Sequence, residues 1–268
     1  MTTTALVTDS TSYLPPALAE RLGITVVPLH VTLAGESFDE PDLPAAEFYR
    51  RLRESGQAPT TSQPSPGEFL QAFSSTGAER VLCITCTASL SGTYSSAVLA
   101  AGMSPVPVEV VDSGTISGGL CLLVGEVGRA LADGASYDDA VALARSLSQR
   151  VASSWTSDTN ALLQAGGRFS DDVPDGVPVM ALEGAVRVLG AARSTEEAID
   201  LQAQAIRASA ASSPTRVTVG HGDVPELADA LAAALDGAPG VLGVDRYVVG
   251  PVVGAHAGAG NVGASWFR

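Results

Sequence analysis

The chain has 268 residues, of which 46% are hydrophobic and 16% are charged, so its composition excludes a disordered protein and suits one large domain or two smaller ones. The net charge at pH 7 is −14, and all 15 basic residues are arginines scattered along the sequence. Because phosphates repel such a chain, we expect neither nucleic acid nor an anionic membrane surface as a partner.

The start of the sequence and its cysteines indicate where the protein resides. The N-terminal residues have neither the basic segment nor the long apolar segment of a signal peptide. No apolar run approaches the roughly 18 residues of a membrane span. The three cysteines are Cys83, Cys86 and Cys121, an odd number in a chain without a secretion signal. These features predict a cytoplasmic protein with no stable membrane insertion.

The first half of the sequence alternates strand and helix. Repeated βα units of this kind predict a parallel sheet covered by helices on both faces. A Ser-x-x-Glu capping box with proline at the first helical position marks the start of the third helix, and a loop that holds Asp39, Glu40 and Asp42 precedes the second. The predicted strands are Ala5–Thr8, Ile24–Val31, Arg80–Thr85 and Val108–Val111, and the predicted helices are Pro15–Leu22, Ala45–Glu54, Ser65–Ser75, Gly92–Ala101 and Ile116–Ala132.

The second half mixes hairpins with helices, which predicts a smaller α/β layer with a mixed sheet. We place the boundary near residue 150, giving domains of residues 1–150 and 151–268. The predicted helices are Tyr137–Val151, a short one capped by Asp158 that ends at Gly166-Gly167, Thr195–Ala211 and Pro225–Leu235. The predicted β-type segments are Ser153–Ser157, Val177–Ala181, Ala185–Leu189, Arg216–Val219, Val241–Val248, Pro251–Ala255 and Asn261–Phe267.

Four clusters of small polar residues, spread along the chain, are the strongest functional signal. Their hydroxyls and glycine amides suit a small anionic head group, and one arginine and one histidine add positive charge. Ligands of parallel sheets bind at the carboxyl ends of the strands, although Ser and Thr at such points also cap helices. The clusters are Thr60–Ser65, Ser89–Tyr94, Gly166–Ser170 with Arg168, and Gly254–Gly258 with His256.

The sharpest of these signals is Ser91-Gly92-Thr93. Gly92 lets the backbone approach a ligand closely, and the free amides of the following helix favour an anion. The sequence has no lysine and no Gly-x-x-x-x-Gly-Lys-Ser/Thr motif, which excludes a phosphate-binding P-loop. The anion is therefore better explained as a carboxylate than as a nucleoside triphosphate.

The histidines differ in their surroundings. Gly258–Gly263 matches Gly-x-Gly-x-x-Gly, but no βαβ unit can follow it so near the end of the sequence, so we reject a dinucleotide site. We interpret this region as a glycine-rich turn that carries an accessible His256. His30 lies in an apolar strand and is expected in the core or at an edge. His221 follows a strand and is a weaker functional candidate.

A hydrolase remains an alternative from the residues alone. Ser91, His256 and Asp112 could form a catalytic triad, but no Gly-x-Ser-x-Gly elbow supports it.

Cys83-x-x-Cys86 has no second pair, so we expect neither zinc nor a redox dithiol there. A surface salt bridge is the alternative role for Arg168, since acidic residues follow it.

Six short motifs stand in a fixed order along the chain: Val7–Ser12, Thr61–Pro66, Leu90–Tyr94, Val111–Ser113, Gly166–Ser170 and the glycine turn around His256. Together they resemble the motifs of the DegV family over essentially the whole chain. The resemblance implies a two-domain α/β fold, with an N-terminal three-layer parallel sheet and a smaller C-terminal mixed-sheet domain. It also implies a long-chain fatty acid buried between the domains and presented to a separate ATP-binding fatty-acid kinase subunit, which makes acyl-phosphate for phospholipid synthesis.

The resemblance also implies roles for single residues. Thr61 and Ser91 look like the hydroxyls that hold the carboxylate, and His256 looks like its third partner. Arg168 and Ser62 look like residues near the edge where phosphoryl transfer occurs. Gly92 and Thr93 complete the expected ligand-binding set.

On this interpretation the protein is a substrate-binding subunit and not itself an enzyme, and we expect no cofactor and no metal. The sequence departs from the family in two places: the segment after Ser170 is shorter, and the His256 turn continues Ala-Gly-Ala-Gly where Gly-Pro-Gly is common. The alternatives are the Ser91/His256 hydrolase and a passive lipid carrier without a kinase.

Overall fold

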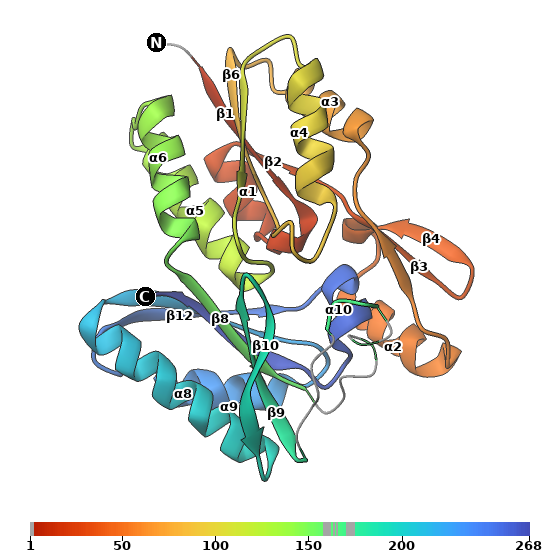
Figure 1. The fold of residues 1–268 in the computed structure, drawn as a ribbon, viewed down its shortest axis with the longest axis vertical. Helices are drawn as coiled ribbons and strands as arrows, with labels where there is room; N and C mark the ends of the chain where they lie inside the picture. The colour runs from red at the N-terminus through yellow and green to blue at the C-terminus, as the bar shows by residue number, and fades with distance from the viewer. Residues whose placement is uncertain (1–2, 158–161, 163, 165, 170–174) are drawn as a thin grey trace.

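The first half of the chain builds a four-stranded parallel sheet in the order β2-β1-β6-β7 (Figure 1). The computed structural model describes residues 3–157, 162, 164, 166–169 and 175–268. The strands are β1 (Thr4–Asp9), β2 (Ile24–Val27), β6 (Arg80–Thr85) and β7 (Val108–Asp112). The helices around them are α1 (Pro16–Leu22), α3 (Pro66–Ser75), α4 (Thr93–Met103), α5 (Gly118–Ala132) and α6 (Tyr137–Ser148).

Successive side chains of the strands pack alternately into two separate hydrophobic cores, one on each face of this sheet. Leu6 and Ile84 belong to the core that α5 and α6 complete, whereas Val7 and Cys83 pack with Phe69 of α3 and with α4. Successive residues of a strand point to opposite faces, so both faces need cover when every residue is apolar. The predicted three-layer arrangement is confirmed.

The second half builds a six-stranded sheet in the order β10-β9-β8-β13-β11-β12. Only β11 and β12 run parallel, so the sheet is mixed, as predicted. Helices α8 (Thr195–Ser212) and α9 (Pro225–Leu235) cover one face, and α5 of the first half lies against the other (Figure 1). The strands are β8 (Val151–Thr156), β9 (Val177–Glu183), β10 (Ala185–Ala192), β11 (Thr215–His221), β12 (Val241–Val248) and β13 (Val262–Phe267). We keep the division near residue 150, between α6 and β8, as a proposal for the domain boundary.

A third, three-stranded antiparallel sheet stands beside the other two, and the sequence did not predict it. Its order is β4-β3-β5, formed by His30–Leu33 (β3), Glu36–Asp39 (β4) and Thr60–Ser62 (β5). Helix α2 (Ala45–Ser55) and helix α10 (Pro251–Ala257) pack with it around Phe48, Tyr49 and Val252. This small sheet carries Thr61 and therefore positions part of the expected site.

Two predictions for the first half were wrong. The expected strand Ile24–Val31 is two strands in different sheets, because Pro28 between them has no N–H to give to a ladder. The expected loop around Asp39 instead contains strand β4 and a short 3-10 helix, η2 (Glu40–Asp42).

Three predictions for the second half also need correction. The expected helix Tyr137–Val151 ends at Ser148, and Val151 already belongs to β8. Pro251–Ala255 is not a β-type run: it opens helix α10, with Pro251 in the first helical turn, where proline is well tolerated. His256 consequently lies in the last turn of a helix and not in a glycine turn. The helix expected after Asp158 begins outside the described residues.

The predicted capping box of α3 is confirmed, and a glycine ends α1. The backbone N–H of Ser65 donates to Glu68 Oε2 over 2.7 Å, and the backbone N–H of Glu68 donates to Ser65 Oγ over 3.3 Å, so the capping box is complete. Gly23 ends α1 with φ +64°, a conformation that glycine adopts without strain.

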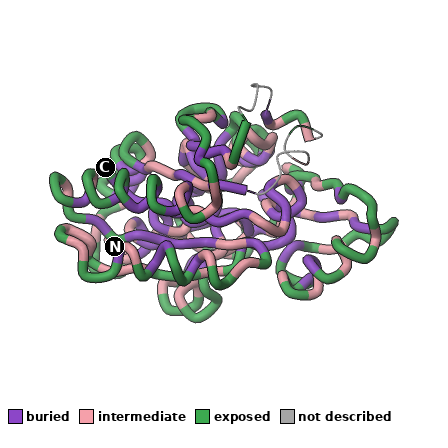
Figure 2. The backbone as a smooth tube through the Cα atoms, turned by 90° about the horizontal axis from the view of Figure 1, so that it is seen from below, coloured by how far each residue is buried: buried purple, intermediate pink, exposed green. Residues whose placement is uncertain are grey.

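Burial follows these layers closely. Figure 2 shows buried segments through the interior of the molecule and exposed segments at its periphery. Among the described residues, no helix is both long enough and apolar enough to span a membrane.

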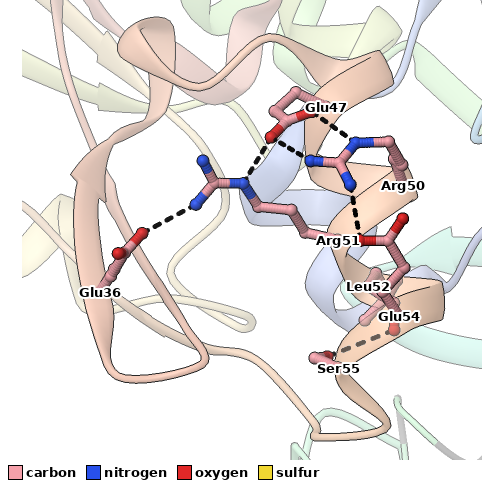
Figure 3. A network of polar contacts seen from close by, with 7 residues as sticks. All are labelled: Glu36, Glu47, Arg50, Arg51, Leu52, Glu54 and Ser55. Atoms are coloured by element: carbon pink, nitrogen blue, oxygen red, sulfur yellow. Dashed lines mark hydrogen bonds and ion pairs between the residues drawn. The ribbon is translucent and has the colours of Figure 1, made fainter.

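The outer face of α2 carries a network of ion pairs that also reaches the small sheet (Figure 3). Arg50 pairs with Glu47 and Glu54 of its own helix, and Arg51 joins Glu47 to Glu36 of β4. These pairs are exposed, so each contributes little to stability. Their geometric effect is to fasten α2 to the β3–β4 hairpin.

Candidate functional site

A cavity opens between the loops that follow the parallel strands and one face of the six-stranded sheet. Five of the residues expected in the site line it together: Thr61, Ser62, Ser91, Arg168 and His256. The lining also includes Leu90, Ile116, Ser117, Ser153, Trp155, Leu182, Val186, Tyr247, Val252 and Ser265. The structure thus brings residues of all four polar clusters together in one cavity.

Thr61 and His256 are in direct contact, although they are far apart in the sequence. Thr61 Oγ1 lies 2.8 Å from His256 Nε2. Burial, and secondarily the charge of Arg168, lowers the pKa of His256 from 6.5 to about 4. The imidazole is therefore neutral at pH 7, with one nitrogen donating and the other accepting. Gly166 makes room for the ring, since a Cβ there would lie 2.7 Å from His256 Nδ1.

Ser91 is held at the start of α4 by Thr93. Ser91 Oγ lies 2.8 Å from Thr93 Oγ1 and accepts the backbone N–H of Thr93 over 3.3 Å. Gly92 and Thr93, unlike Ser91, are not in the cavity lining. A Cβ on Gly92 would lie 2.7 Å from Gln63 Nε2, so this glycine allows α4 to approach the segment that follows β5. Their expected role as ligand contacts stays a prediction; the role visible here is to position Ser91 and its surroundings.

Arg168 brings a positive charge to the cavity. Its Nε donates to the carbonyl of Leu90 over 3.4 Å, and its Nη1 donates to the carbonyl of Gly166. No described acidic residue, Asp175 included, pairs with it; Asp171 and Asp172, which the alternative of a surface salt bridge also involves, lie outside the described residues. Ser62 lies in the same lining but is exposed, which places it toward the mouth.

The remaining wall of the cavity is largely apolar. A buried cluster of Phe169, Met180, Leu182 and Val186 packs against Leu90, Ile116 and Trp155, and several of these side chains also line the cavity. A polar end that can bind an anion thus continues into an apolar wall. This combination fits an amphipathic ligand with a small acidic head.

Sequence reasoning missed a second set of polar residues in the lining. Ser117, with φ +60°, places its Oγ 2.7 Å from Tyr247 Oη, which also accepts the N–H of Gly118 over 2.9 Å. Ser153 Oγ and Ser265 Oγ lie 2.8 Å apart. The motif Val111–Ser113 ends four residues before Ser117, whereas no motif marks Tyr247. Because these hydroxyls bind one another, they are less available to a ligand.

The alternative triad is not assembled in the structure. The partner of Ser91 is Thr93, and the ring of His256 contacts Thr61. The Asp112 carboxylate instead accepts backbone N–H groups of Ala88 and Gly114. A serine hydrolase needs its nucleophile and base within hydrogen-bond reach of one another, and Ser91 and His256 contact other partners instead.

The other candidate residues lie outside the polar end of the site. His30 was expected in the core or at an edge; it is partly exposed at the first position of β3 and pairs with Asp39 and Glu68, so it does not lie in the core. His221 is absent from the cavity lining. Burial raises the pKa of the Cys83 and Cys86 thiols well above the usual range, which disfavours a reactive thiolate. Within the described ranges, no cluster of acidic, histidine and cysteine side chains could hold a metal.

Comparison with known proteins gives consistent results. The model of the DegV family matches residues 3–268. A DegV domain-containing protein of Streptomyces coelicolor is 33% identical over 270 residues, covering 97% of this chain and 96% of the relative. The chain is similar to a DegV family protein from Thermus thermophilus described as fatty acid binding, with a TM-score of 0.93, 32% identity and 99% of each chain covered. It is also similar to DegV, a fatty acid binding protein from Bacillus subtilis, with a TM-score of 0.92, 27% identity and 100% of each chain covered.

Proposed function

Because the chain belongs to the DegV family, we propose that it binds a long-chain fatty acid in this cavity and presents the carboxylate to a separate ATP-dependent kinase subunit. The observation that carries the proposal is the Thr61–His256 contact of 2.8 Å at one end of a cavity with an apolar wall. Solved relatives that bind fatty acids support the choice of ligand.

The polar end supplies donors for a buried carboxylate, which is costly to bury unless it is hydrogen-bonded. A neutral His256 protonated on Nε2 donates to Thr61 Oγ1 and so leaves the hydroxyl proton of Thr61 for the ligand. Ser91 Oγ accepts the N–H of Thr93 and lies 2.8 Å from Thr93 Oγ1. With Thr93 as the donor in that second contact, Ser91 keeps its own hydroxyl proton for the ligand. Two hydroxyls thus hold the carboxylate without a fixed salt bridge, and its oxygen stays available as a phosphoryl acceptor.

Arg168 has a different role in this proposal. Phosphoryl transfer spreads negative charge that positive groups or Mg²⁺ must stabilise, and Arg168 brings a positive charge to the cavity. The chain would therefore act as a substrate-binding subunit, and the kinase would supply the ATP site and the metal. A passive lipid carrier is the competing outcome, in which no ATP-binding protein is retained by the lipid-loaded chain.

Substitution of the two central hydroxyls tests the proposal. Thr61→Ala and Ser91→Ala should each weaken fatty-acid binding by about tenfold or more, because a hydrogen bond to a charged group is worth about 1.5–3 kcal/mol. Thr32→Ala is a matched control: Thr32 lies on the same small sheet, bonds to Ser37 and does not line the cavity. Titration calorimetry with a long-chain fatty acid measures all three. Wild-type affinity in both cavity variants would place the carboxylate elsewhere, and covalent labelling of Ser91 by a fluorophosphonate would favour the hydrolase.

A further inference from the structure

Glu40 is a buried carboxylate that the proposed function does not use. It is 4% exposed, and no arginine or histidine of the described residues pairs with it. It accepts three hydrogen bonds: from Ser10 Oγ over 2.6 Å, from Tyr13 Oη over 3.0 Å and from the backbone N–H of Val252 over 2.8 Å. Burying a carboxylate without a cation carries a large desolvation free energy. The three hydrogen bonds to Glu40 offset part of it.

The bond to Val252 connects Glu40 to the helix that carries His256. Val252 lies in the first turn of α10 and His256 in the last. A helix of this length is a stiff rod of about 10 Å, so fixing its first turn also fixes the position of its last. Glu40 is therefore linked to the ligand site through α10, without touching it.

The small sheet contacts α10 at both ends. Glu40 directly follows β4, whereas Thr61 lies in β5, and both strands flank β3. Val31 of β3 is the register partner of Phe38 on one side and of Thr61 on the other. Glu40 thus binds the first turn of α10 and Thr61 binds the ring of His256 in its last turn. The two contacts and the sheet form a closed ring of interactions.

We propose that Glu40 is a positioning residue of the ligand site: by fastening the first turn of α10 to the small sheet, it sets the contact between His256 and Thr61. The consequence for fatty-acid affinity rests on the proposed function, whereas the placement of His256 does not. Removing Glu40 should loosen α10, expose the imidazole and weaken its contact with Thr61.

Tyr13 completes the attachment of α10. The backbone N–H of Val253 donates to Tyr13 Oη over 3.1 Å, and the same hydroxyl donates to Glu40. The first N–H groups of a helix have no partner within it, so Glu40 and Tyr13 satisfy two of them. The chain is tightly packed here, since a Cβ on Gly250 would lie 2.4 Å from Tyr13 Cε1 and 3.0 Å from Glu40 Oε1.

The attachment should survive protonation of Glu40. Burial, with a smaller contribution from nearby Asp9, raises the pKa of Glu40 to about 7; the other titratable groups that act on this region are Tyr13 and Tyr49. Ser10 Oγ already accepts the N–H of Leu29 over 2.9 Å and can also accept a proton-bearing Glu40 Oε2, which leaves Oε1 for Val252. A glutamine should keep the same pattern, with its amide nitrogen toward Ser10.

The titration of His256 in ligand-free protein tests the proposal directly. The chain has three histidines, so NMR can follow each ring separately after assignment with His30→Gln and His221→Gln variants. In Glu40→Ala the pKa of His256 should rise toward its ordinary value, because burial is the main cause of its lowering. In Glu40→Gln it should stay low. Glu36→Ala is the matched control: Glu36 is an exposed glutamate of the same hairpin, paired with Arg51, and its loss should not move His256.

Fatty-acid titration then measures the consequence for binding. Glu40→Ala should lower affinity by about tenfold, the effect of one well-made hydrogen bond at the site, whereas Glu40→Gln should restore it. If Glu40→Ala does not fold, Glu40→Asp decides by the same measurement, because it keeps the charge but is too short to reach Val252.

The outcomes separate the two proposals. A folded Glu40→Ala or Glu40→Asp with a wild-type His256 titration would overturn the positioning role. Failure of the wild-type protein to bind any fatty acid would overturn the proposed function instead, and it would leave a shifted His256 titration in Glu40→Ala as support for the positioning role.

Discussion

His256 illustrates how the surroundings of one side chain determine its chemistry. Its ring is partly buried and lies beside Thr61, against Gly166 and near Arg168. Burial and the arginine charge both disfavour a proton on the ring. The cavity therefore contains a neutral imidazole that hydrogen-bonds to Thr61, and Arg168 is the cation beside it.

The low pKa of His256 predicts a loss of stability in acid. The unfolded chain protonates this ring near pH 6.5, whereas the folded protein does so only near pH 4. The unfolded state thus binds more protons between these values, and the free energy of unfolding should fall as the pH drops from 6.5 to 4. Urea unfolding at a series of pH values should show a shallower acid dependence in His256→Gln than in wild type. An identical slope in the two proteins would contradict the low pKa.

The raised pKa of Glu40 gives the free energy of unfolding a pH dependence of the opposite sign. Its pKa rises from 4.5 in the unfolded chain to about 7 in the folded protein, because burial disfavours the charge. The folded state therefore binds the proton more tightly, and its contribution to stability is lost as the pH rises from 4.5 through 7. At about 1.4 kcal/mol per pH unit, this loss is on the order of 3 kcal/mol. Glu40→Gln should remove it, so the variant should gain stability relative to wild type between pH 5 and 8. A constant difference across this range would argue against a raised pKa.

At the scale of elements, the position of α10 is what joins Thr61 to His256. Gly254 permits α10 to lie against α2, since a Cβ there would lie 2.6 Å from Tyr49 Oη and 2.9 Å from Phe48 Cε1. Tyr49 also donates from its hydroxyl to the carbonyl of Val249 over 3.0 Å, just before α10. The close approach of these two helices is therefore built into the sequence by a single small residue.

Gly254→Ala should separate the two helices. Both aromatic neighbours are fully buried, so the extra methyl should overpack this core and cost about 1–3 kcal/mol of stability. Gly102→Ala is the matched control, because Gly102 lies in α4 with nothing within 4 Å of its added Cβ; alanine should be neutral or stabilising there. Thermal unfolding of both variants measures the difference, and equal melting temperatures would mean that α10 can shift freely.

The sequence signals for elements succeed or fail for identifiable reasons. Strand β12 was predicted with its correct bounds because Val241–Val248 is rich in valine and lies between Gly240 and Gly250. Helix α10 was not, since Val252 and Val253 favour a strand and tertiary contacts with α2 and the small sheet override that preference. Strand β5 has only three residues, Thr60–Ser62, and so offers no alternation to detect.

At the scale of the whole molecule, the parallel sheet was predictable and the cavity only partly so. Repeated βα units identify the first sheet, and the residues after its strands identify one edge as a binding site. Ser91, Arg168 and His256 could be singled out from residue type and spacing, whereas Thr61 stood out from its cluster only through the resemblance to the DegV family. Tyr247 could not, because its contact with Ser117 arises only when β12 of the second sheet meets the start of α5.

Substitution of Arg168 should affect phosphoryl transfer to the fatty acid without affecting fatty-acid binding. Its contacts are to the carbonyls of Leu90 and Gly166 and not to Thr61 or Ser91. Arg168→Ala should therefore leave fatty-acid affinity nearly unchanged while acyl-phosphate formation with a partner kinase falls. Both quantities can be measured on one preparation, with Arg193→Ala as a control, since Arg193 is exposed and pairs with Glu197 outside the cavity. Loss of lipid binding in Arg168→Ala would instead place the guanidinium on the carboxylate.

If this chain holds a fatty acid by its carboxylate, as proposed, the acid should accompany the purified protein. Denaturing extraction followed by mass spectrometry, together with native mass spectrometry of the intact protein, should find one long-chain fatty acid per chain in wild type and in Thr32→Ala. The amount should be reduced in the double variant of Thr61→Ala and Ser91→Ala. A wild-type protein that carries no fatty acid and takes none up when one is added would contradict the account.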